Sequence, residues 1–295
     1  MSIKISIKKT ISDKDVKNYV LFCNENFKIN GINKISLKNQ SKQIERSINT
    51  FKSKDKTFLS LNINPTQKII LIKIEKTQNS TEVEKIGAKF FNYIKSNSIF
   101  DVTIFNNNIK ETSNKNSNFL DEFLHGAKLK SYNFDKYKSK RKNEVFNIVI
   151  SSDKTPLKFD QNKRYNSLLE GTNFTKDLVS EPGNILHPDE YARRLKQLSK
   201  YGLKVVVYDK NKLKKLSMNA LLGVGQGSIR GSYLVTIEWN GSKSKNKPLA
   251  FVGKGVCFDT GGISLKPAKF MEDMTYDMAG SAVVVGLMKN LALRK

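Results

Sequence analysis

The sequence predicts an α/β protein with two domains: an N-terminal α/β domain over residues 1–150 and an α/β/α domain with a central mixed sheet over residues 151–295. Segments with the apolar alternation of strands recur along the chain, separated by segments with the apolar spacing of helices. That order builds a sheet covered on both faces. Most glycines and prolines lie in the second half, and the polar segment Ser151–Gln161 is expected to be a linker.

Residues 1–150 contain short β-rich segments and two segments of helical spacing. Asn64–Gln67 is typical of a hairpin turn, and Thr81 with Glu84 three residues later predicts a capping box at the first helix. His125 lies in the second helix without a nearby partner in sequence, and we expect it to be structural. The expected strands are 3–7, 58–63, 69–74, 100–105 and 145–150, and the expected helices are 80–95 and 118–128.

Residues 151–295 are expected to alternate helices and strands in the same way. Leu249–Gly253 is nearly all apolar, which predicts a central strand, because central strands are buried on both faces. Pro182 is expected to end the first helix of this half. The expected helices are 164–179, 189–200, 211–216 and 279–293, and the expected strands are 203–208, 233–239 and 249–253.

The chain carries 52 lysines and arginines against 27 acidic residues, a formal net charge of +25. Residues 1–150 hold 28 of the basic and 14 of the acidic side chains, so the excess is spread along the chain. Only seven basic residues are arginine, which is the residue preferred for bidentate phosphate and base contacts. The charge therefore favours a solvated surface. A non-enzymatic nucleic-acid-binding protein, with DNA as its partner, is the alternative function.

Two cysteines, Cys23 and Cys257, exclude a disulfide framework and point to a reducing compartment. The longest apolar stretch, Ser281–Leu293, contains Lys289 and is shorter than the roughly 20 residues that a membrane span needs. The N-terminus alternates apolar and polar residues and lacks the continuous apolar core of a secretory signal. We therefore expect a cytoplasmic protein without a membrane partner.

The segment richest in chemical side chains runs from Val252 to Asp277. A predicted buried strand enters a loop with four glycines, and loops at the carboxyl ends of such strands are where α/β sites form. Lys254, Asp259, Lys266 and Asp277 flank this loop. Carboxylates beside an apolar strand need compensation, which divalent cations supply. The spacing alone does not distinguish two interpretations: a metal site, and a solvated turn in which the lysines and aspartates form ion pairs.

This segment resembles the signature of the leucine aminopeptidase (cytosol aminopeptidase) family of dinuclear metallopeptidases. In that family a lysine, an aspartate five residues later and an aspartate eighteen beyond bind the metals, and Lys254, Asp259 and Asp277 match this spacing. The resemblance covers roughly residues 165–295 in order. Three other segments resemble the family's catalytic domain: 170–184, 220–228 and 234–239.

The resemblance implies a metalloaminopeptidase that releases N-terminal residues from peptides in intracellular peptide turnover. It implies two divalent ions, manganese or zinc, that activate a water. Lys266 would be the catalytic residue that polarises the scissile carbonyl, and Met274 would line the pocket for the first side chain of the substrate. The family also implies peptide substrates and a homo-hexamer.

The family completes its site with a later Asn-Thr-Asp-Ala-Glu-Gly-Arg motif, whose acidic residues bind the metals and whose arginine holds bicarbonate. These 295 residues do not contain that motif, so the bicarbonate-site arginine is absent. We therefore expect a truncated, incomplete catalytic domain with impaired activity. One metal position would keep Lys254, Asp259 and Asp277, and the other would keep only Asp259.

Three other motifs carry less weight. Gly223–Ser228 has the glycines of a dinucleotide loop, but its last glycine is out of place. Cys257 needs a histidine partner to act as a nucleophile, and His187, which precedes Pro188 in a turn, is expected to be structural. The sequence contains no Gly-x-Ser-x-Gly motif, which disfavours a serine hydrolase.

Overall fold

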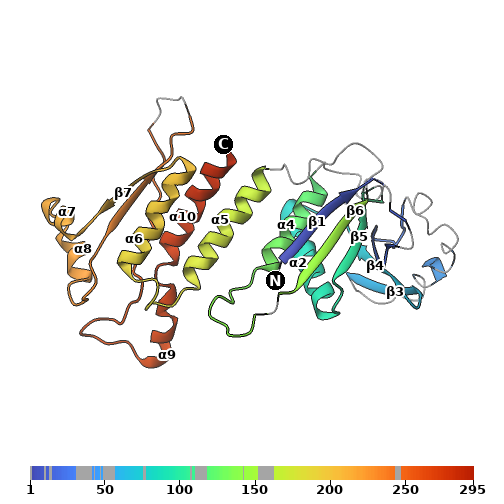
Figure 1. Cartoon of the computed structure of the whole chain (residues 1–295), viewed down its shortest axis with the longest axis horizontal. Helices are drawn as coiled ribbons and strands as arrows, with labels where there is room; N and C mark the ends of the chain where they lie inside the picture. Colours follow the sequence, from blue (N-terminus) through green and yellow to red (C-terminus); the bar gives the residue numbers. More distant parts are fainter. Residues whose placement is uncertain are drawn as a thin grey trace. The chain divides into compact units, whose positions relative to one another are not determined.

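The chain divides into two compact units, Met1–Asn162 and Lys163–Lys295, in a computed structural model (Figure 1). The predicted linker lies almost wholly outside the residues that the structure describes, and none of the described helices is long and apolar enough to cross a membrane. The structure describes residues 2–9, 11, 12, 15–30, 42, 44–46, 48, 57–75, 78–106, 108, 109, 118–141, 143–151, 163–242 and 247–295.

The N-terminal unit is built on a six-stranded mixed sheet with the strand order β1-β6-β5-β2-β4-β3. Only the edge pair β3–β4 is antiparallel; every other neighbouring pair is parallel. The strands are β1 (Ser2–Lys8), β2 (Asn18–Cys23), β3 (Phe58–Asn64), β4 (Gln67–Lys73), β5 (Asp101–Phe105) and β6 (Val145–Ser151). The sequence patterns predict all of these strands except β2.

Apolar residues of β2 pack into two different cores, one on each face of the sheet. Val20 and Phe22 belong to the core that α2 (Ser80–Ser96) and α4 (Phe119–Ser131) cover, and these helices lie side by side (Figure 1). Tyr19 and Leu21 point to the opposite face, where they share a core with Ile48. Burial on both faces explains why this strand reads as a continuous apolar run without alternation.

Helix α2 begins two residues earlier than the predicted capping box. The Asn79 side chain accepts from the Glu82 N–H at 3.0 Å, and the Glu82 carboxylate accepts from the Asn79 N–H at 2.8 Å. The prediction of Thr81 and Glu84 as the box is therefore wrong. Asparagine is at least as good an N-cap as threonine. Asn79 caps the helix two residues before Thr81, so that Thr81 lies inside the helix and not at its start.

Glu84 instead points across to α4. Its carboxylate lies 2.9 Å from His125 Nδ1, and the His125 side chain is almost fully buried between the helices. This partner of His125 is 41 positions away in the chain, and the place of His125 in the helix packing agrees with a structural role. The two helices can approach closely because residue 126 is glycine, since a Cβ at this position would overlap the Glu84 carbonyl oxygen.

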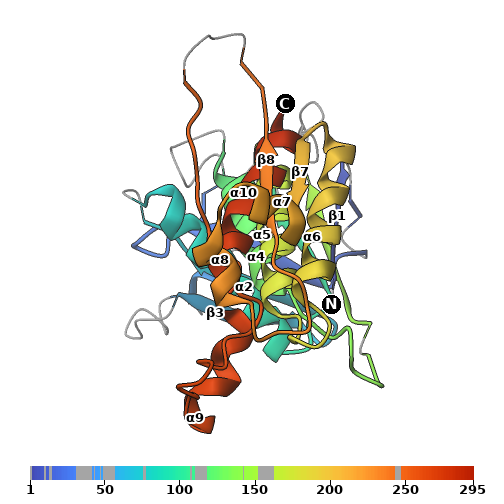
Figure 2. The same ribbon diagram turned by 90° about the vertical axis from the view of Figure 1, so that its left-hand side faces the viewer.

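In the C-terminal unit, helices stand beside a two-stranded antiparallel sheet (Figure 2). The longest, α5 and α10, pack against each other, and a Cβ on Gly171 would lie 2.5 Å from the Gly286 carbonyl oxygen. The helices are α5 (Lys163–Val179), α6 (Pro188–Lys196), α7 (Lys210–Lys215), α8 (Asn219–Val224), α9 (Ala268–Met271) and α10 (Ala279–Arg294), and the strands are β7 (Lys204–Tyr208) and β8 (Leu234–Glu238).

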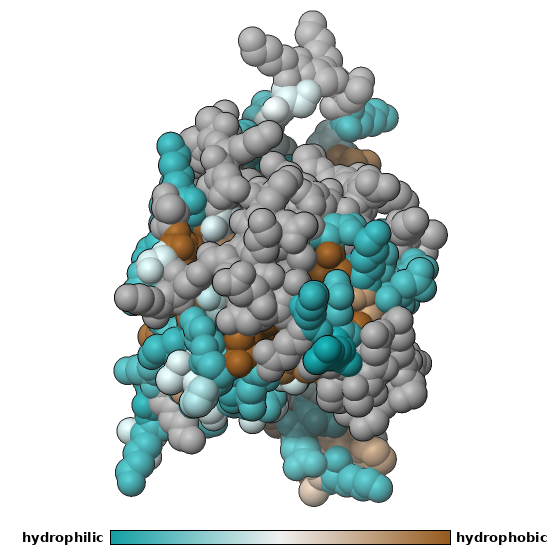
Figure 3. All heavy atoms as spheres, turned by 90° about the vertical axis from the view of Figure 1, so that its right-hand side faces the viewer, coloured by the Kyte–Doolittle hydropathy of each residue, from teal (hydrophilic) through white to brown (hydrophobic). Residues whose placement is uncertain are grey.

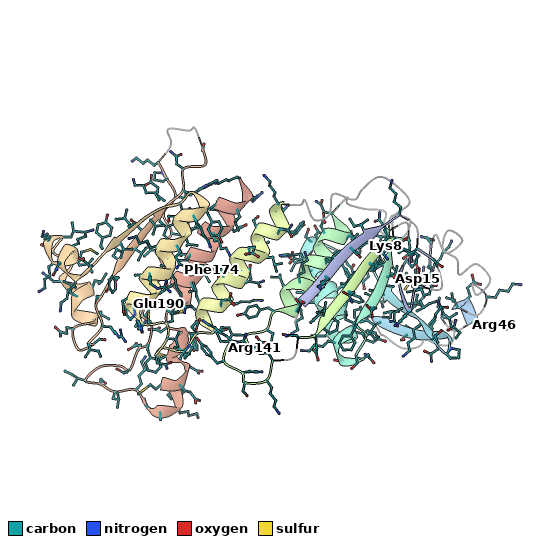
Figure 4. The ribbon with its side chains drawn as sticks, in the orientation of Figure 1. Lys8, Asp15, Arg46, Arg141, Phe174 and Glu190 are labelled. Atoms are coloured by element: carbon teal, nitrogen blue, oxygen red, sulfur yellow. The ribbon has the colours of Figure 1, made fainter. Side chains whose placement is uncertain are left out.

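Charged side chains fix helix α6, on which Figure 4 labels Glu190. The Glu190 carboxylate accepts from Arg193 Nε at 2.6 Å and from Arg194 Nε at 2.8 Å. Arg194 also donates to the buried carboxylate of Glu181 at 2.8 Å, which ties α6 to the turn after α5. His187 stands at the N-cap position of the helix, with Nδ1 2.5 Å from the Asp189 carboxylate, which agrees with the structural role expected for it.

The predicted strand Leu249–Gly253 is not a strand in the structure. Its residues have no regular secondary structure and pair with no strand in the described part of the chain, and Val252 is 95% exposed. A central strand is stabilised by hydrogen bonds to a neighbour on each side, and among the described residues of this unit only β7 and β8 form a sheet. The α/β class itself is confirmed.

The described residues on one face of the N-terminal unit are mostly polar (Figure 3). On the face shown in Figure 3, hydrophilic residues predominate among the coloured atoms, and apolar residues form small, separate spots. Exposed large apolar side chains are concentrated instead in the C-terminal unit, around residues 249–283.

Candidate metal centre

The glycine-rich loop takes its shape from two residues in the left-handed region. Gly261 and Gly262 have φ values of 90° and 72°, where a side chain is strained. The Gly261 N–H donates to Asp259 Oδ1 at 2.9 Å, and the Lys266 N–H donates to the Thr260 carbonyl at 2.9 Å. These bonds fold the loop back so that Asp259 and Lys266 lie together.

Asp259 and Lys266 form the first of two ion pairs, with 3.2 Å between Oδ2 and Nζ. The pKa of Asp259 is lowered, first because its carboxylate accepts the Gly261 N–H and second because Lys266 bonds to it. Both side chains are about one third exposed, so water screens this pair. Asp259 is therefore ionised and available to a cation at neutral pH.

Lys254 and Asp277 form the second ion pair. Lys254 Nζ lies 2.9 Å from Asp277 Oδ2; the lysine side chain is 57% exposed and the aspartate side chain only 17%. The Asp277 carboxylate raises the pKa of Lys254 above its ordinary value, so the amine carries its proton. An amine in this state cannot bind a metal, and metal binding at Lys254 must release that proton.

Asp277 provides a test of whether these residues suit a cation. Its Oδ2 atom is buried, and the Lys254 ammonium group lies 2.9 Å from it. A buried carboxylate oxygen needs a positively charged partner, which Lys254 supplies here and which a divalent cation can also supply. Carboxylate oxygens with one deprotonated amine suit manganese or zinc, so the residues fit such an ion.

The site residues expected from the sequence are only partly brought together. Lys254 meets Asp277, and Asp259 meets Lys266, but the described residues contain no cluster of three or more His, Cys, Asp or Glu side chains. Met274 is half-buried in the short 3₁₀ turn Glu272–Tyr276 (η5), and its carbonyl accepts the Asp277 N–H at 3.3 Å. Its role toward a substrate stays a prediction.

Cys257 lies within this loop, and its thiol is poorly suited to act as a nucleophile. Burial raises the pKa of its thiol to about 12, and the nearby Asp189 carboxylate raises it further. The histidine nearest in sequence, His187, places Nδ1 2.5 Å from Asp189. A thiol with so high a pKa is not deprotonated at neutral pH.

Two side chains near the loop were not expected from the sequence. The Tyr191 hydroxyl of α6 lies 2.9 Å from Ser281 Oγ in the first turn of α10, and the Ser281 N–H donates to the Lys254 carbonyl at 2.9 Å. The two residues are ninety positions apart in the chain, and no spacing pattern connects them.

The fold and the loop define a class of protein: two α/β units, the second carrying a glycine-rich loop with two lysine–carboxylate pairs. Residues 173–295 match the catalytic domain of the cytosol aminopeptidase family, and residues 31–141 match the N-terminal domain of the same family. Together these two regions cover most of the chain.

Relatives agree with this match. A probable cytosol aminopeptidase of Phytoplasma mali is 51% identical over 180 residues, which cover 59% of this chain and 36% of that protein. A probable cytosol aminopeptidase of Ehrlichia ruminantium is 43% identical over 237 residues, 77% of this chain and 46% of that protein. The chain belongs to the cytosol aminopeptidase family, and it spans less than half the length of these relatives.

Solved structures show the same fold. A mutant of tomato leucine aminopeptidase superposes with a TM-score of 0.75 at 22% identity, over 98% of this chain and 59% of that one. The bottromycin maturation enzyme BotP, in complex with Mn, superposes with a TM-score of 0.70 at 19% identity, over 94% of this chain and 56% of that one.

Proposed function

We propose that this chain carries part of the active site of a leucyl aminopeptidase-type metallopeptidase, which releases N-terminal residues from peptides in the cytoplasm. One observation carries the proposal: both lysine–carboxylate pairs lie in the segment 254–277, which contains the glycine-rich loop and falls inside the region that matches the family's catalytic domain. None of the matches described above names a nucleic-acid-binding protein, so the alternative function gains no support.

Lys254, Asp259 and Asp277 are the proposed ligands of a divalent ion, manganese or zinc. When bound, such an ion supplies a Lewis acid that polarises a carbonyl and lowers the pKa of water. These three residues supply ligands for one metal position. Two ions, as in the intact family, need further ligands, and the family's hexamer is likewise a proposal for the whole enzyme.

Lys266 is the proposed catalytic residue. Its ammonium group is held beside Asp259, where it can stabilise negative charge that develops on the scissile carbonyl oxygen. The ion pair with Asp259 limits the movement of the lysine side chain. Met274 is proposed to contact the first side chain of the peptide, since it lies three residues before Asp277 and is half-buried.

Metal binding tests this proposal. Isothermal titration of the dialysed chain with Mn²⁺ should give no more than one tight site, and Asp277→Asn should weaken it at least about tenfold, because it removes a charged ligand. Asp273→Asn is the matched control, since Asp273 is exposed in the same 3₁₀ turn and should leave the affinity unchanged. Unaltered affinity in Asp277→Asn, or two tight sites, would contradict the ligand assignment.

Turnover is measured separately with a leucyl chromogenic amide and added Mn²⁺. Any metal-dependent hydrolysis should be lost in Lys266→Ala, because the variant lacks the charge that faces the carbonyl. Activity that survives this substitution would exclude Lys266 as the catalytic residue. The residues present supply only one metal position, so turnover is expected to be weak. In that case the Mn²⁺ titration described above tests the proposal.

A further inference from the structure

Ser281 forms hydrogen bonds to the backbone at Lys254 and next to Asp277, the two residues of the second ion pair. Its N–H donates to the Lys254 carbonyl at 2.9 Å, and its hydroxyl donates to the Met278 carbonyl at 2.8 Å, one residue after Asp277. The serine therefore fixes the backbone beside both charged residues at once.

The loop also lies directly on the first turn of α10. A Cβ on Gly253 would come within 2.5 Å of the Ser281 Cα atom and 2.7 Å of the Gly280 carbonyl oxygen. Only glycine fits at that distance, since real Cβ atoms do not approach backbone so closely. The position of Lys254 is thus determined by the position of Ser281.

Tyr191 holds Ser281 from the other side. Its hydroxyl lies 2.9 Å from Ser281 Oγ, and because the one Ser281 hydroxyl proton goes to Met278, the tyrosine donates this bond. Tyr191 is 5% exposed and shares a core with Met278 and Ala282. Burial raises the pKa of Tyr191 to about 12, so the phenol remains a donor throughout the neutral range.

We propose that Tyr191 and Ser281 are positioning residues that hold Lys254 and Asp277 at the separation a shared cation requires. The inference rests on the proposed function, in which Lys254 and Asp277 are metal ligands. Tyr191 in turn is held by α6, whose carboxylate–arginine bonds leave the helix little freedom to shift. Groups that orient metal ligands affect affinity without touching the metal.

The test compares Tyr191→Phe and Ser281→Ala with the unaltered chain, using Co²⁺ as the probe. Each variant should weaken Co²⁺ binding about tenfold and change the visible absorption spectrum of the bound ion, since the ligand geometry loosens. Ser281→Thr keeps the hydroxyl and should bind within about twofold of the unaltered chain. Tyr208→Phe, which removes a hydroxyl from β7, is the matched control and should bind normally.

A second measurement separates this inference from the proposed function. Hydrogen exchange of the metal-free chain should be faster over residues 278–284 in Tyr191→Phe and Ser281→Ala, with the melting temperature nearly unchanged. Unaltered Co²⁺ affinity, spectrum and exchange in both variants would overturn the positioning role. If Asp277→Asn binds Co²⁺ as the unaltered chain does, the proposed function is wrong, and the exchange result alone then decides whether Tyr191 and Ser281 organise this turn.

Discussion

Individual side chains of this protein derive their chemistry from burial and from one or two close partners. Cys23 and Cys257 are both buried, and burial raises the pKa of each thiol to about 12. Asp259 is exposed enough to be screened, yet the Gly261 N–H keeps it ionised. An exposed cysteine would have a lower thiol pKa than these two, and a buried aspartate without such partners would have a higher carboxyl pKa than Asp259.

The two thiols should therefore be almost unreactive in the native chain. With Ellman's reagent at pH 8, we expect labelling to be at least about 100-fold slower than that of free cysteine, because the thiolate is the reacting species. Unfolding in guanidinium chloride should expose both thiols at once and serves as the control. Rapid labelling of either native thiol would show that it is accessible to the reagent and contradict this prediction.

The sequence predicts the charged site residues better than the residues that support them. Lys254, Asp259 and Asp277 can be recognised in the sequence by their spacing. In the structure, each of them has a partner of opposite charge. No sequence pattern identifies Tyr191 and Ser281, because serine and tyrosine are common in helices. Their contact forms only when α6 packs beside α10.

Helices and strands are predicted wherever their own side chains decide the conformation. The helices α2, α5 and α10 and the hairpin β3–β4 follow from local apolar spacing and turn residues. Leu249–Gly253 fails because strand formation depends on a neighbouring strand that local spacing does not reveal. β2 is not predicted because its sequence does not alternate between apolar and polar residues. It lies between the parallel strands β4 and β5 and is apolar on both faces.

The crossing of α5 and α10 depends on a residue without a side chain. A Cβ on Gly286 would overlap Thr175 Oγ1 and come within 2.7 Å of the Gly171 carbonyl oxygen. Thr175 cannot move away freely, because its hydroxyl bonds to Gly171 and Ala282 carbonyls. We expect Gly286→Ala to lower the free energy of unfolding by about 1–3 kcal/mol, measured by urea denaturation.

The matched control for this substitution is Gly223→Ala in α8. A Cβ there would have open space, so the gain in helix propensity should raise stability by up to about 1 kcal/mol. Equal effects at both positions would mean that the α5–α10 contact does not determine the cost.

Helix α6 should make stability sensitive to acid. Bonds from Arg193 and Arg194 lower the pKa of Glu190 from 4.5 to about 2 in the folded chain. A folded pKa below the unfolded one stabilises the protein fully above about 4.5, and this contribution is lost as pH falls towards 2. The melting temperature of Glu190→Gln should therefore be lower than that of the unaltered chain at pH 6, and the difference should shrink below pH 4.

Glu272→Gln provides the comparison for this acid effect. Glu272 is exposed in the 3₁₀ turn, and the substitution should leave the pH profile of melting unchanged. A constant difference between Glu190→Gln and the unaltered chain from pH 6 to pH 2 would refute the role assigned to Glu190.

At the scale of the whole molecule, the apolar surface of the C-terminal unit should cause self-association. Val252 and Ile263 are almost fully exposed, and several other apolar side chains near them are exposed as well. Contiguous exposed apolar surface favours association in water. Light scattering of the isolated chain should reveal a heterogeneous mixture whose mean size grows with concentration.

Substitution tests the cause of that association. Val252→Lys combined with Ile263→Lys should shift the mixture towards monomer, whereas Asn219→Lys adds charge at another exposed site and should change little. A single species of fixed size, insensitive to these substitutions, would indicate that the apolar residues are covered in solution.

The pairing of β1 with β6 sets an order in time for the growing polypeptide. Ser2–Lys8 has its one neighbour within the described sheet in Val145–Ser151, more than a hundred residues downstream. At translation rates of roughly 5–20 residues per second, β1 remains without a partner for on the order of ten seconds. During that interval its apolar residues Ile3 and Ile5 are open to chaperones and to neighbouring nascent chains on the same message.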